Sequence, residues 1–290
     1  MPPARVHPVA FTGAPGAYSQ EAARRYFGSG HPTLTCRSVA EAVQAVTTGR
    51  ASHAVLPVEN SITGCFPGVT EALFEAELEV VGELILRIRN CLMAAPGAKL
   101  DDLTVITSHV IALSQCRDWL TNWGVATRPS PDTAEAAREL SRTGDAALGV
   151  IGSMSLAQMY GLDILAEGIS DRPDNRTRFL IVSRDREQAA LGPRVRSGLL
   201  VGPLTAPRAL KTLRIQLESL GARRARVPFL GSEDGRRFLV EFDHGTDAGP
   251  AIVELAFAGL PHRSLGSWAL PPDAGAVAAD PRRTERKTSA

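Results

Sequence analysis

The stretch TLTCRSVAEAVQAVTTGRASHAVL, residues 33–56, contains one complete strand-helix-strand pattern. Strands are predicted at residues 33–36 and 54–56, where short runs of β-favouring residues occur. Between them, Ser38 and Glu41 form a capping box, apolar side chains follow at helical spacing, and Gly49 marks the end of the helix. Strands that alternate with amphipathic helices are typical of α/β layers, so this stretch predicts an α/β fold.

The same alternation continues through the first 183 residues and predicts two α/β lobes. Lobe 1 is expected to contain residues 1–90 and 166–183, and lobe 2 residues 91–165. The chain therefore crosses between the lobes, as in proteins of the periplasmic-binding-protein type. A cleft is expected at the junction, which is the usual place for a small ligand.

A separate C-terminal domain follows a polar linker at residues 184–196. Residues 197–270 show a β-α-β-β-α-β order over a length that is typical of a ferredoxin-like unit. Residues 271–290 are rich in proline, alanine and charge, with little to bury, and we expect them to be disordered.

The composition argues against several classes of protein. A net charge of +1, with 22% charged residues, gives no reason to expect nucleic acid or an anionic membrane as a partner. The four cysteines lie singly and without ligand spacing to histidine, which argues against a metal site or a disulfide framework. No run has the length of a signal-peptide core or a membrane span, so a cytoplasmic protein is expected.

Three polar segments of the first 183 residues are candidates for chemistry: residues 13–21 (GAPGAYSQE), 56–64 (LPVENSITG) and 171–178 (DRPDNRTR). The first is a glycine turn that opens a helix, where free N–H groups attract carboxylate or phosphate. The second places an acceptor, an amide and a hydroxyl at the end of a strand. Each segment, taken alone, is also explained without function, as a turn, a helix cap or a solvated salt-bridge cluster. His109, between a predicted strand and helix, is a fourth candidate.

Taken together, these segments resemble the prephenate dehydratase family over nearly the whole chain. The matching motifs are PGAYSQEAA (15–23), AVLPVENSITG (54–64), SH-x-x-AL-x-QC (108–116), YGL (160–162) and N-x-TRF (175–179). The first motif is more similar to the plant arogenate dehydratases than to the commoner bacterial form. The C-terminal unit falls where the family carries an ACT-type regulatory domain, and LGSW (265–268) is similar to the closing motif of that domain.

The resemblance implies a lyase that removes water and CO2 from prephenate and forms phenylpyruvate in phenylalanine biosynthesis. No cofactor and no metal is implied. The essential threonine of the family is kept as Thr177, which we expect to donate a hydrogen bond to the departing hydroxyl, while Arg178 is expected to hold a carboxylate. The expected catalytic residues are Thr177, Ser61, Asn60 and Glu59. The expected substrate-binding residues are Ala17, Tyr18, Ser19, Arg178, Phe179, Asn175 and His109.

The regulatory unit departs from the family pattern. Arg208, which precedes Ala209 and Leu210, stands where the family has a glycine, and the effector motif at the end of the second strand is replaced by Arg226, Val227 and Pro228. An arginine obstructs the approach of an amino acid to the backbone, so inhibition by L-phenylalanine is not expected. The unit can still assemble the chain into a homodimer or homotetramer.

Two alternatives remain open from the sequence. A dehydratase of secondary metabolism acting on arogenate or a substituted prephenate fits the same motifs, because both side chains present a carboxylate at the same distance. A solute-binding protein also has two α/β lobes, but it would be expected to carry an export signal.

Overall fold

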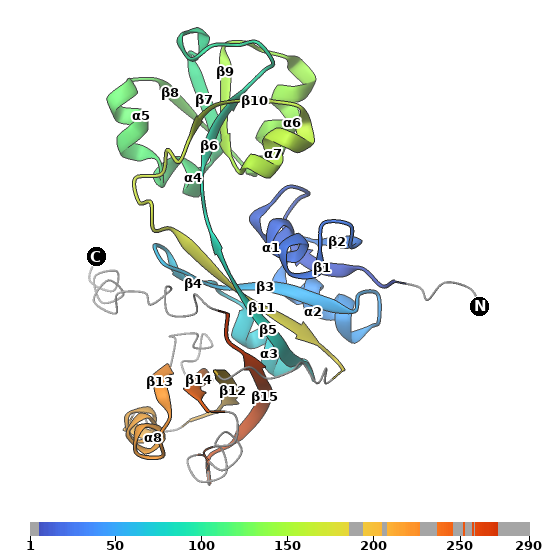
Figure 1. Ribbon diagram of the computed structural model, residues 1–290, viewed down its shortest axis with the longest axis vertical. Coiled ribbons are helices and arrows are strands. Elements are labelled where there is room, and N and C mark those ends of the chain that lie inside the picture. Colours follow the sequence, from blue (N-terminus) through green and yellow to red (C-terminus); the bar gives the residue numbers. More distant parts are fainter. Residues whose placement is uncertain are drawn as a thin grey trace, which may run out of the picture.

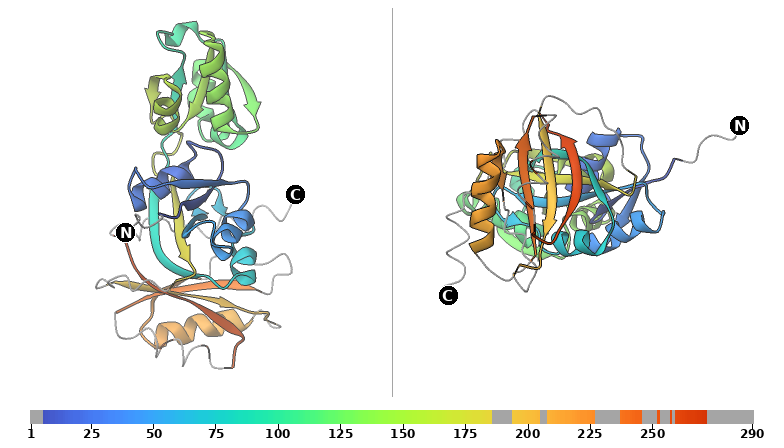
Figure 2. Two further views of the ribbon diagram at one scale, coloured as in Figure 1. Left: turned by 90° about the vertical axis from the view of Figure 1, so that its right-hand side faces the viewer. Right: turned by 90° about the horizontal axis from the view of Figure 1, so that it is seen from below.

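The computed structural model describes residues 6–185, 194–204, 208–226, 237–245, 252, 257 and 259–271. Three bodies are stacked along the long axis of the molecule: lobe 2, lobe 1 and the C-terminal domain (Figures 1 and 2). Lobe 1 is therefore in contact with both of the others.

Lobe 1 is built on a mixed sheet with the strand order β2-β1-β3-β11-β5. The strands are β1 (Val9–Thr12), β2 (Thr33–Cys36), β3 (His53–Asn60), β5 (Glu79–Arg87) and β11 (Arg176–Ser183), and β4 (Gly64–Cys65) pairs with β3. The helices are α1 (Tyr18–Phe27), α2 (Val39–Thr47) and α3 (Val69–Glu75). The predicted cap of α2 is confirmed, because the Ser38 side chain accepts a hydrogen bond from the Glu41 amide.

Successive residues of the lobe 1 strands face opposite sides of the sheet, as strand geometry requires. Val9, Val55 and Ile181 pack with the α1 side chains Ala22 and Ala23. Their neighbours Ala10, Ala54 and Leu180 pack on the other side, in the cluster that contains α2 and α3. The sheet is thus buried on both faces, which explains the continuous apolar runs at residues 54–58 of β3 and 179–182 of β11.

Lobe 2 has a second mixed sheet, with the order β10-β6-β9-β7-β8. Its strands are β6 (Cys91–Ala94), β7 (Val105–His109), β8 (Ala126–Ser130), β9 (Leu148–Gly152) and β10 (Asp163–Glu167). Its helices are α4 (Val110–Ser114), α5 (Arg117–Trp123), α6 (Thr133–Thr143) and α7 (Met154–Tyr160), with the short 3-10 helix η1 (Leu100–Asp102).

The helical sequence pattern of residues 111–123 is divided between two helices, α4 and α5. The break is stabilised from the crossing segment, because the Asp171 carboxylate accepts hydrogen bonds at 3.0 Å from the amides of Arg117 and Asp118 and so caps α5. The Asp171 amide in turn donates to the Gln115 carbonyl at 2.8 Å. A local helical pattern cannot reveal this break, since the capping carboxylate is more than fifty positions away in the chain.

The two lobes are joined by residues 88–90 and 168–175, which run side by side. The Ile88 amide donates to the Asn175 carbonyl at 2.8 Å, and the Ile169 amide donates to the Asn90 carbonyl at 3.2 Å. These crossings form the narrow waist between the upper lobe and the rest of the molecule (Figure 1).

The C-terminal domain is a sheet with the order β13-β14-β12-β15. Its strands are β12 (Val195–Val201), β13 (Arg223–Arg226), β14 (Phe238–His244) and β15 (His262–Ala269), and its described helix is α8 (Arg208–Ser219). The first and third strands, β12 and β14, pair at the centre, as in a ferredoxin-like unit. The expected linker to residue 196 is too long, since β12 already begins at Val195.

The C-terminal sheet lies between α8 and lobe 1 (Figure 2). Leu199, Val240 and Phe242 pack with Leu213 and Leu217 of α8. On the opposite face, the domain contributes a second set of side chains to the core of lobe 1: Leu200, Leu239, Leu265 and Trp268. Most of the second helix expected for this domain, and nearly all of the predicted tail, lie outside the described residues.

In the part of the chain that the structure describes, no helix combines the length and the apolar character needed to cross a lipid bilayer.

Candidate active site

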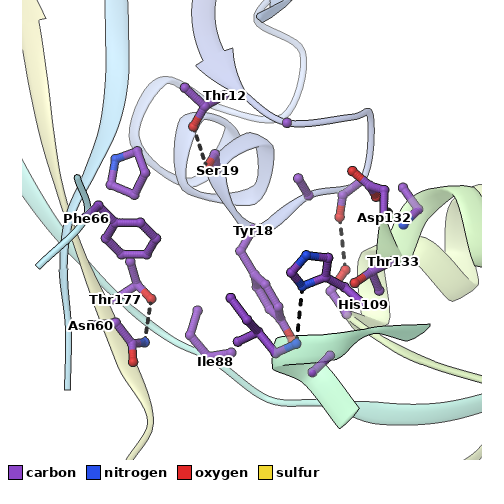
Figure 3. Close-up of a pocket in the computed structure, with 18 of the residues that line it drawn as sticks. Thr12, Tyr18, Ser19, Asn60, Phe66, Ile88, His109, Asp132, Thr133 and Thr177 are labelled. Carbon is purple, nitrogen blue, oxygen red and sulfur yellow. Dashed lines mark hydrogen bonds between the residues drawn. The ribbon is translucent and has the colours of Figure 1, made fainter. Parts of the chain in front are cut away.

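A cavity of about 550 Å³ lies between lobe 1 and lobe 2. Figure 3 shows that side chains of both lobes point into it. Lobe 1 contributes the ends of β1 and β3, the beginning of β11 and the start of α1, and lobe 2 contributes the starts of α4, α6 and α7. The predicted site residues that line it are Ala17, Tyr18, Ser19, Asn60, His109, Thr177 and Phe179.

Thr177 and Asn60 form the polar centre of the lobe 1 wall. They are register partners on β11 and β3, and both are buried. The Asn60 amide nitrogen donates to the Thr177 hydroxyl oxygen at 3.0 Å (Figure 3). Because this oxygen already accepts a hydrogen bond, the hydroxyl proton of Thr177 is left to be donated to a bound molecule.

Asn60 is itself held in place by the turn that precedes β11. Its amide nitrogen lies 2.8 Å from the Asn175 side-chain oxygen, and its own side-chain oxygen accepts from the amides of Ile62 and Thr63 at 2.9 and 3.0 Å. Asn175 does not line the cavity, so its expected contact with substrate is wrong; it orients Asn60 instead.

Ser61 is also placed differently from the prediction. Its hydroxyl accepts from the Arg176 amide at 3.0 Å and donates to the Asp174 carbonyl at 3.3 Å, and it does not line the cavity. Ser61 therefore fastens the turn before β11 and is not a catalytic group in this geometry.

Arg178 and Glu59 lie on the opposite face of the lobe 1 sheet from the cavity. Arg178 is 1% exposed and forms a two-point ion pair with Glu241 of the C-terminal domain, and Glu59 lies 3.9 Å from the same guanidinium. The predictions that Arg178 holds a substrate carboxylate and that Glu59 is catalytic are both wrong. The reason is strand alternation: Thr177 and Phe179 face the cavity, so the residue between them faces away.

Several helices start at the cavity, and most of them have side-chain caps. Ser38, Asp132 and Ser153 accept hydrogen bonds from the amides of Glu41, Ala134 and Leu156 at the starts of α2, α6 and α7. His109 does the same for α4, where its Nδ1 accepts from the Ile111 amide at 3.3 Å.

The start of α1 differs, because its N-cap residue Ala17 has no side chain that can accept a hydrogen bond. The amides of Tyr18 and Ser19, at the first two positions of this helix, have no partner within the helix. They are therefore available to an anion, and the helix dipole favours negative charge there.

The charge in the cavity wall is sparse. Among the described residues that line the cavity, Arg37 carries the one permanent positive charge. Its side chain is exposed, and only its backbone amide is engaged, donating to Glu41 at 2.7 Å. Arg37 is thus able to meet an anionic ligand that enters between the lobes.

Tyr18 connects this wall to the waist of the molecule. Its hydroxyl lies 2.8 Å from the Arg89 carbonyl and 3.1 Å from the Asn90 side-chain oxygen. Burial, with a smaller contribution from Glu21, raises the pKa of the Tyr18 phenol well above its usual value. The phenol is therefore neutral and acts as a hydrogen-bond donor to the backbone of the crossing segment.

Sequence reasoning did not assign Arg37 or the capped helix starts to the site. Ser38 and Asp132 each follow the carboxyl end of a strand, which is the one local signal that could have included them. Arg37 lies between the end of β2 and Ser38, so the same signal applies to it. The expected effector residues lie at the ends of two elements or beyond them. Ala209 and Leu210 follow Arg208 in the first turn of α8, and Arg226 ends β13. Val227 and Pro228 lie outside the described residues.

Comparison with known proteins identifies one family throughout. The family model described as prephenate dehydratase matches residues 9–187. The chain is 41% identical over 177 residues to arogenate dehydratase/prephenate dehydratase 1, chloroplastic, of Arabidopsis thaliana, in an alignment that covers 61% of this chain and 45% of the plant protein. This chain therefore matches less than half the length of that relative.

Two further comparisons extend over the C-terminal domain. The chain is 35% identical to the bifunctional N-acyl-homoserine lactone acylase/prephenate dehydratase of Komagataeibacter europaeus, over 91% of this chain and 96% of that protein. The solved structure of prephenate dehydratase from Arthrobacter aurescens in complex with L-Phe is similar at a TM-score of 0.76 and 29% identity, covering 97% of each chain.

Proposed function

Because this chain belongs to the prephenate dehydratase family, we propose that it binds prephenate in the cavity between its lobes and converts it to phenylpyruvate. The observation that carries the proposal is the hydrogen bond from Asn60 to the Thr177 oxygen, which leaves the Thr177 proton for the substrate.

The reaction breaks two bonds and consumes one proton. The bond between the ring and its carboxylate breaks and releases CO2, and its electron pair moves through the ring and expels the hydroxyl group. That group takes up one proton and leaves as water. Because the product ring is aromatic, the enzyme mainly has to orient the substrate and assist the leaving group.

Thr177 is the group that we assign to the departing hydroxyl. A threonine hydroxyl is a poor acid, so its role is to donate a hydrogen bond that strengthens as negative charge develops on the leaving oxygen. Phe179, on the same face of β11, provides an apolar surface for the ring.

The two carboxylates of prephenate need partners that Arg178 cannot provide. We assign one to the uncapped amides of Tyr18 and Ser19 at the start of α1 and the other to the Arg37 guanidinium. Both lie on lobe 1, and lobe 2 forms the opposite wall of the cavity, with the Asp132 carboxylate already engaged by the Ala134 amide.

The substrate assignment is tested by incubating the purified protein separately with prephenate, arogenate and an N-acyl-homoserine lactone, and identifying the products by mass. Phenylpyruvate from prephenate is the expected result. Preferential formation of phenylalanine from arogenate would move the assignment to that substrate, for which arogenate dehydratases 1 and 2 of Petunia hybrida are named. Recovery of unchanged prephenate and arogenate, with binding, would instead support a solute-binding protein.

For the C-terminal domain we propose a homo-oligomer contact without a phenylalanine site. The support is Arg208 at the start of α8, where a small residue would be needed for an amino acid to approach the backbone. The structure of the Arthrobacter aurescens relative contains L-Phe, which makes this amino acid the ligand to test.

A further inference from the structure

A buried ion network joins lobe 1 to the C-terminal domain. The Arg178 guanidinium on β11 donates to both carboxylate oxygens of Glu241 on β14, one of them at 2.7 Å. The Glu83 carboxylate on β5 lies 3.8 Å from the Nε atom of the same guanidinium. Arg178, Glu83 and Glu241 are all nearly inaccessible to solvent, so water does not screen these contacts.

The network continues through a second arginine. Arg196 on β12 donates to Glu83 at 2.9 and 3.0 Å and to Asp243 at 2.6 and 3.2 Å, and the Trp268 indole donates to Glu83 at 3.1 Å. Burial alone would raise the pKa of Glu83, but the guanidiniums of Arg178 and Arg196 outweigh it and hold this pKa below its usual range. Glu83 is therefore charged and shared by both arginines.

The network meets the active site at the peptide bond between Thr177 and Arg178. Thr177 faces the cavity and is buried, while the next residue faces the C-terminal domain. The pairing of β11 with β5 is regular at this point, but its pairing with β3 shifts register between Arg178 and Phe179, so the ladder is interrupted on the β3 side. At such an irregularity the backbone hydrogen bonds fix the strand less firmly than in a regular ladder.

We propose that Arg178 is a positioning residue for Thr177, and that Glu241 of the C-terminal domain holds it in place. The planar peptide unit makes any tilt of the strand at Arg178 move the Thr177 hydroxyl as well. This inference rests on the proposed function, in which that hydroxyl faces the departing group. The C-terminal domain is then part of the catalytic unit rather than an appended module.

The chain offers a matched pair of variants on one strand. Glu241 and Asp243 lie two residues apart on β14, and each forms a buried ion pair with an arginine on the side of the sheet that faces lobe 1. Only the partner of Glu241 belongs to β11. Glu241→Gln and Asp243→Asn therefore remove equivalent charges, but only the first releases the strand that carries Thr177.

The expected result is a fall in kcat of roughly 10- to 100-fold for E241Q, with a KM for prephenate close to that of the wild type. D243N should lower Tm to a similar degree while its kcat stays within about threefold of the wild type. R178K, which keeps the charge but loses the two-point contact, should fall between the wild type and E241Q. Equal effects of E241Q and D243N on kcat would overturn the proposal.

A double variant separates positioning from folding. Replacing both partners, as in R178M/E241M, removes the ion pair between β11 and β14 and keeps apolar volume at both positions, and kcat should remain low. This variant also carries the test if E241Q does not fold. A kcat restored to the wild-type value in the double variant would show that the ion pair serves stability alone.

The same variants distinguish a failure of this inference from a failure of the proposed function. If the wild type converts none of the substrates, the proposed function fails, and the inference is then judged by hydrogen–deuterium exchange. E241Q should accelerate exchange in the peptide that contains Thr177 more than D243N does, and equal exchange in the two variants would reject the role of Arg178.

Discussion

At the scale of single residues, the hydroxyl of Thr177 is the group on which the proposed chemistry depends. Asn60 donates to its oxygen, so the loss of the hydroxyl removes the donor to the leaving group and also leaves the Asn60 amide with one partner fewer. Both effects are confined to the cavity wall.

Thr177→Ala should therefore lower kcat by roughly 10² to 10⁴-fold, the usual range for a positioned proton-transfer group, and leave the fold intact. Steady-state kinetics with prephenate and near-ultraviolet circular dichroism measure the two quantities. Thr177→Ser is the matched control, since it keeps the hydroxyl, and it should retain most of the activity. A loss of only a few-fold in T177A would return Thr177 to a structural role.

Arg37 is the second residue with a specific expectation. Its permanent charge lines the cavity, and Arg50, an exposed arginine of the same lobe, does not. Arg37→Met should raise the KM for prephenate roughly tenfold, because a charge-assisted hydrogen bond to a carboxylate is lost, whereas Arg50→Met should not change it. An unchanged KM in R37M would exclude Arg37 as a carboxylate partner.

At the scale of secondary-structure elements, the turn before α1 controls how closely the lobes approach. Gly16 has a φ of +89°, and a Cβ atom at this position would overlap the Leu156 side chain of α7. The Gly16 carbonyl also accepts a hydrogen bond from Ser153 at 3.1 Å. The two lobes thus meet at a residue whose positive φ and lack of a Cβ atom require glycine.

Gly16→Ala should lower kcat/KM by about tenfold or more, because it holds lobe 2 away from Thr177. Gly28→Ala is the matched control: its φ is +95°, but nothing lies within 4 Å of the added methyl group. Both variants should lose roughly 1 to 3 kcal/mol of stability from backbone strain, and only G16A should lose activity. Equal kinetic losses in the two variants would mean that strain, not lobe contact, is responsible.

The strand β11 shows how one element serves two sites. Its Thr177 and Phe179 line the cavity, and Arg178 between them lies in the ion network with Glu241. β14 is also paired with β13, and Arg226 of β13 lies opposite Glu241 in the strand register. A displacement of β13 would therefore move Glu241 and, through its ion pair, Arg178.

At the scale of the whole molecule, the interface between lobe 1 and the C-terminal domain makes stability depend on pH. The pKa of Glu83 is lower in the folded chain than the value of about 4.3 expected when unfolded. Its contribution to stability is thus complete above about pH 4.3 and is lost as the pH falls through the lower, folded pKa.

The free energy of unfolding, measured by urea titration from pH 6 downward, should therefore fall with acid more steeply in the wild type than in Glu83→Gln. The variant is less stable throughout, but it lacks the proton uptake of this carboxylate on unfolding. Identical slopes in the two proteins would contradict the assigned direction of the pKa shift.

Binding of L-phenylalanine to the C-terminal domain would change the melting temperature of the whole chain. With Arg208 at the start of α8, L-phenylalanine should leave Tm unchanged. A bound ligand at about 100 times its Kd adds roughly 2.7 kcal/mol, which a thermal-shift titration detects readily. A clear rise of Tm with L-phenylalanine, and not with D-phenylalanine, would overturn the expectation.

Features that depend on neighbouring residues could be predicted from the sequence. Alternating strands and helices, the cap at Ser38 and the succession of strands along the C-terminal domain follow from signals a few positions apart. The motifs containing Asn60 and Thr177 were also recognisable, and these two residues line the cavity.

Which side chains share a site depends on the tertiary structure. Strand alternation fixes that Thr177 and Arg178 face opposite ways, but it does not say which of them faces the cavity. The answer lies in contacts across 117 positions, from Asn60 to Thr177, and across 63 positions, from Arg178 to Glu241. Local patterns carry no information at such separations, because packing of the three bodies, and not the propensity of any segment, brings these groups together.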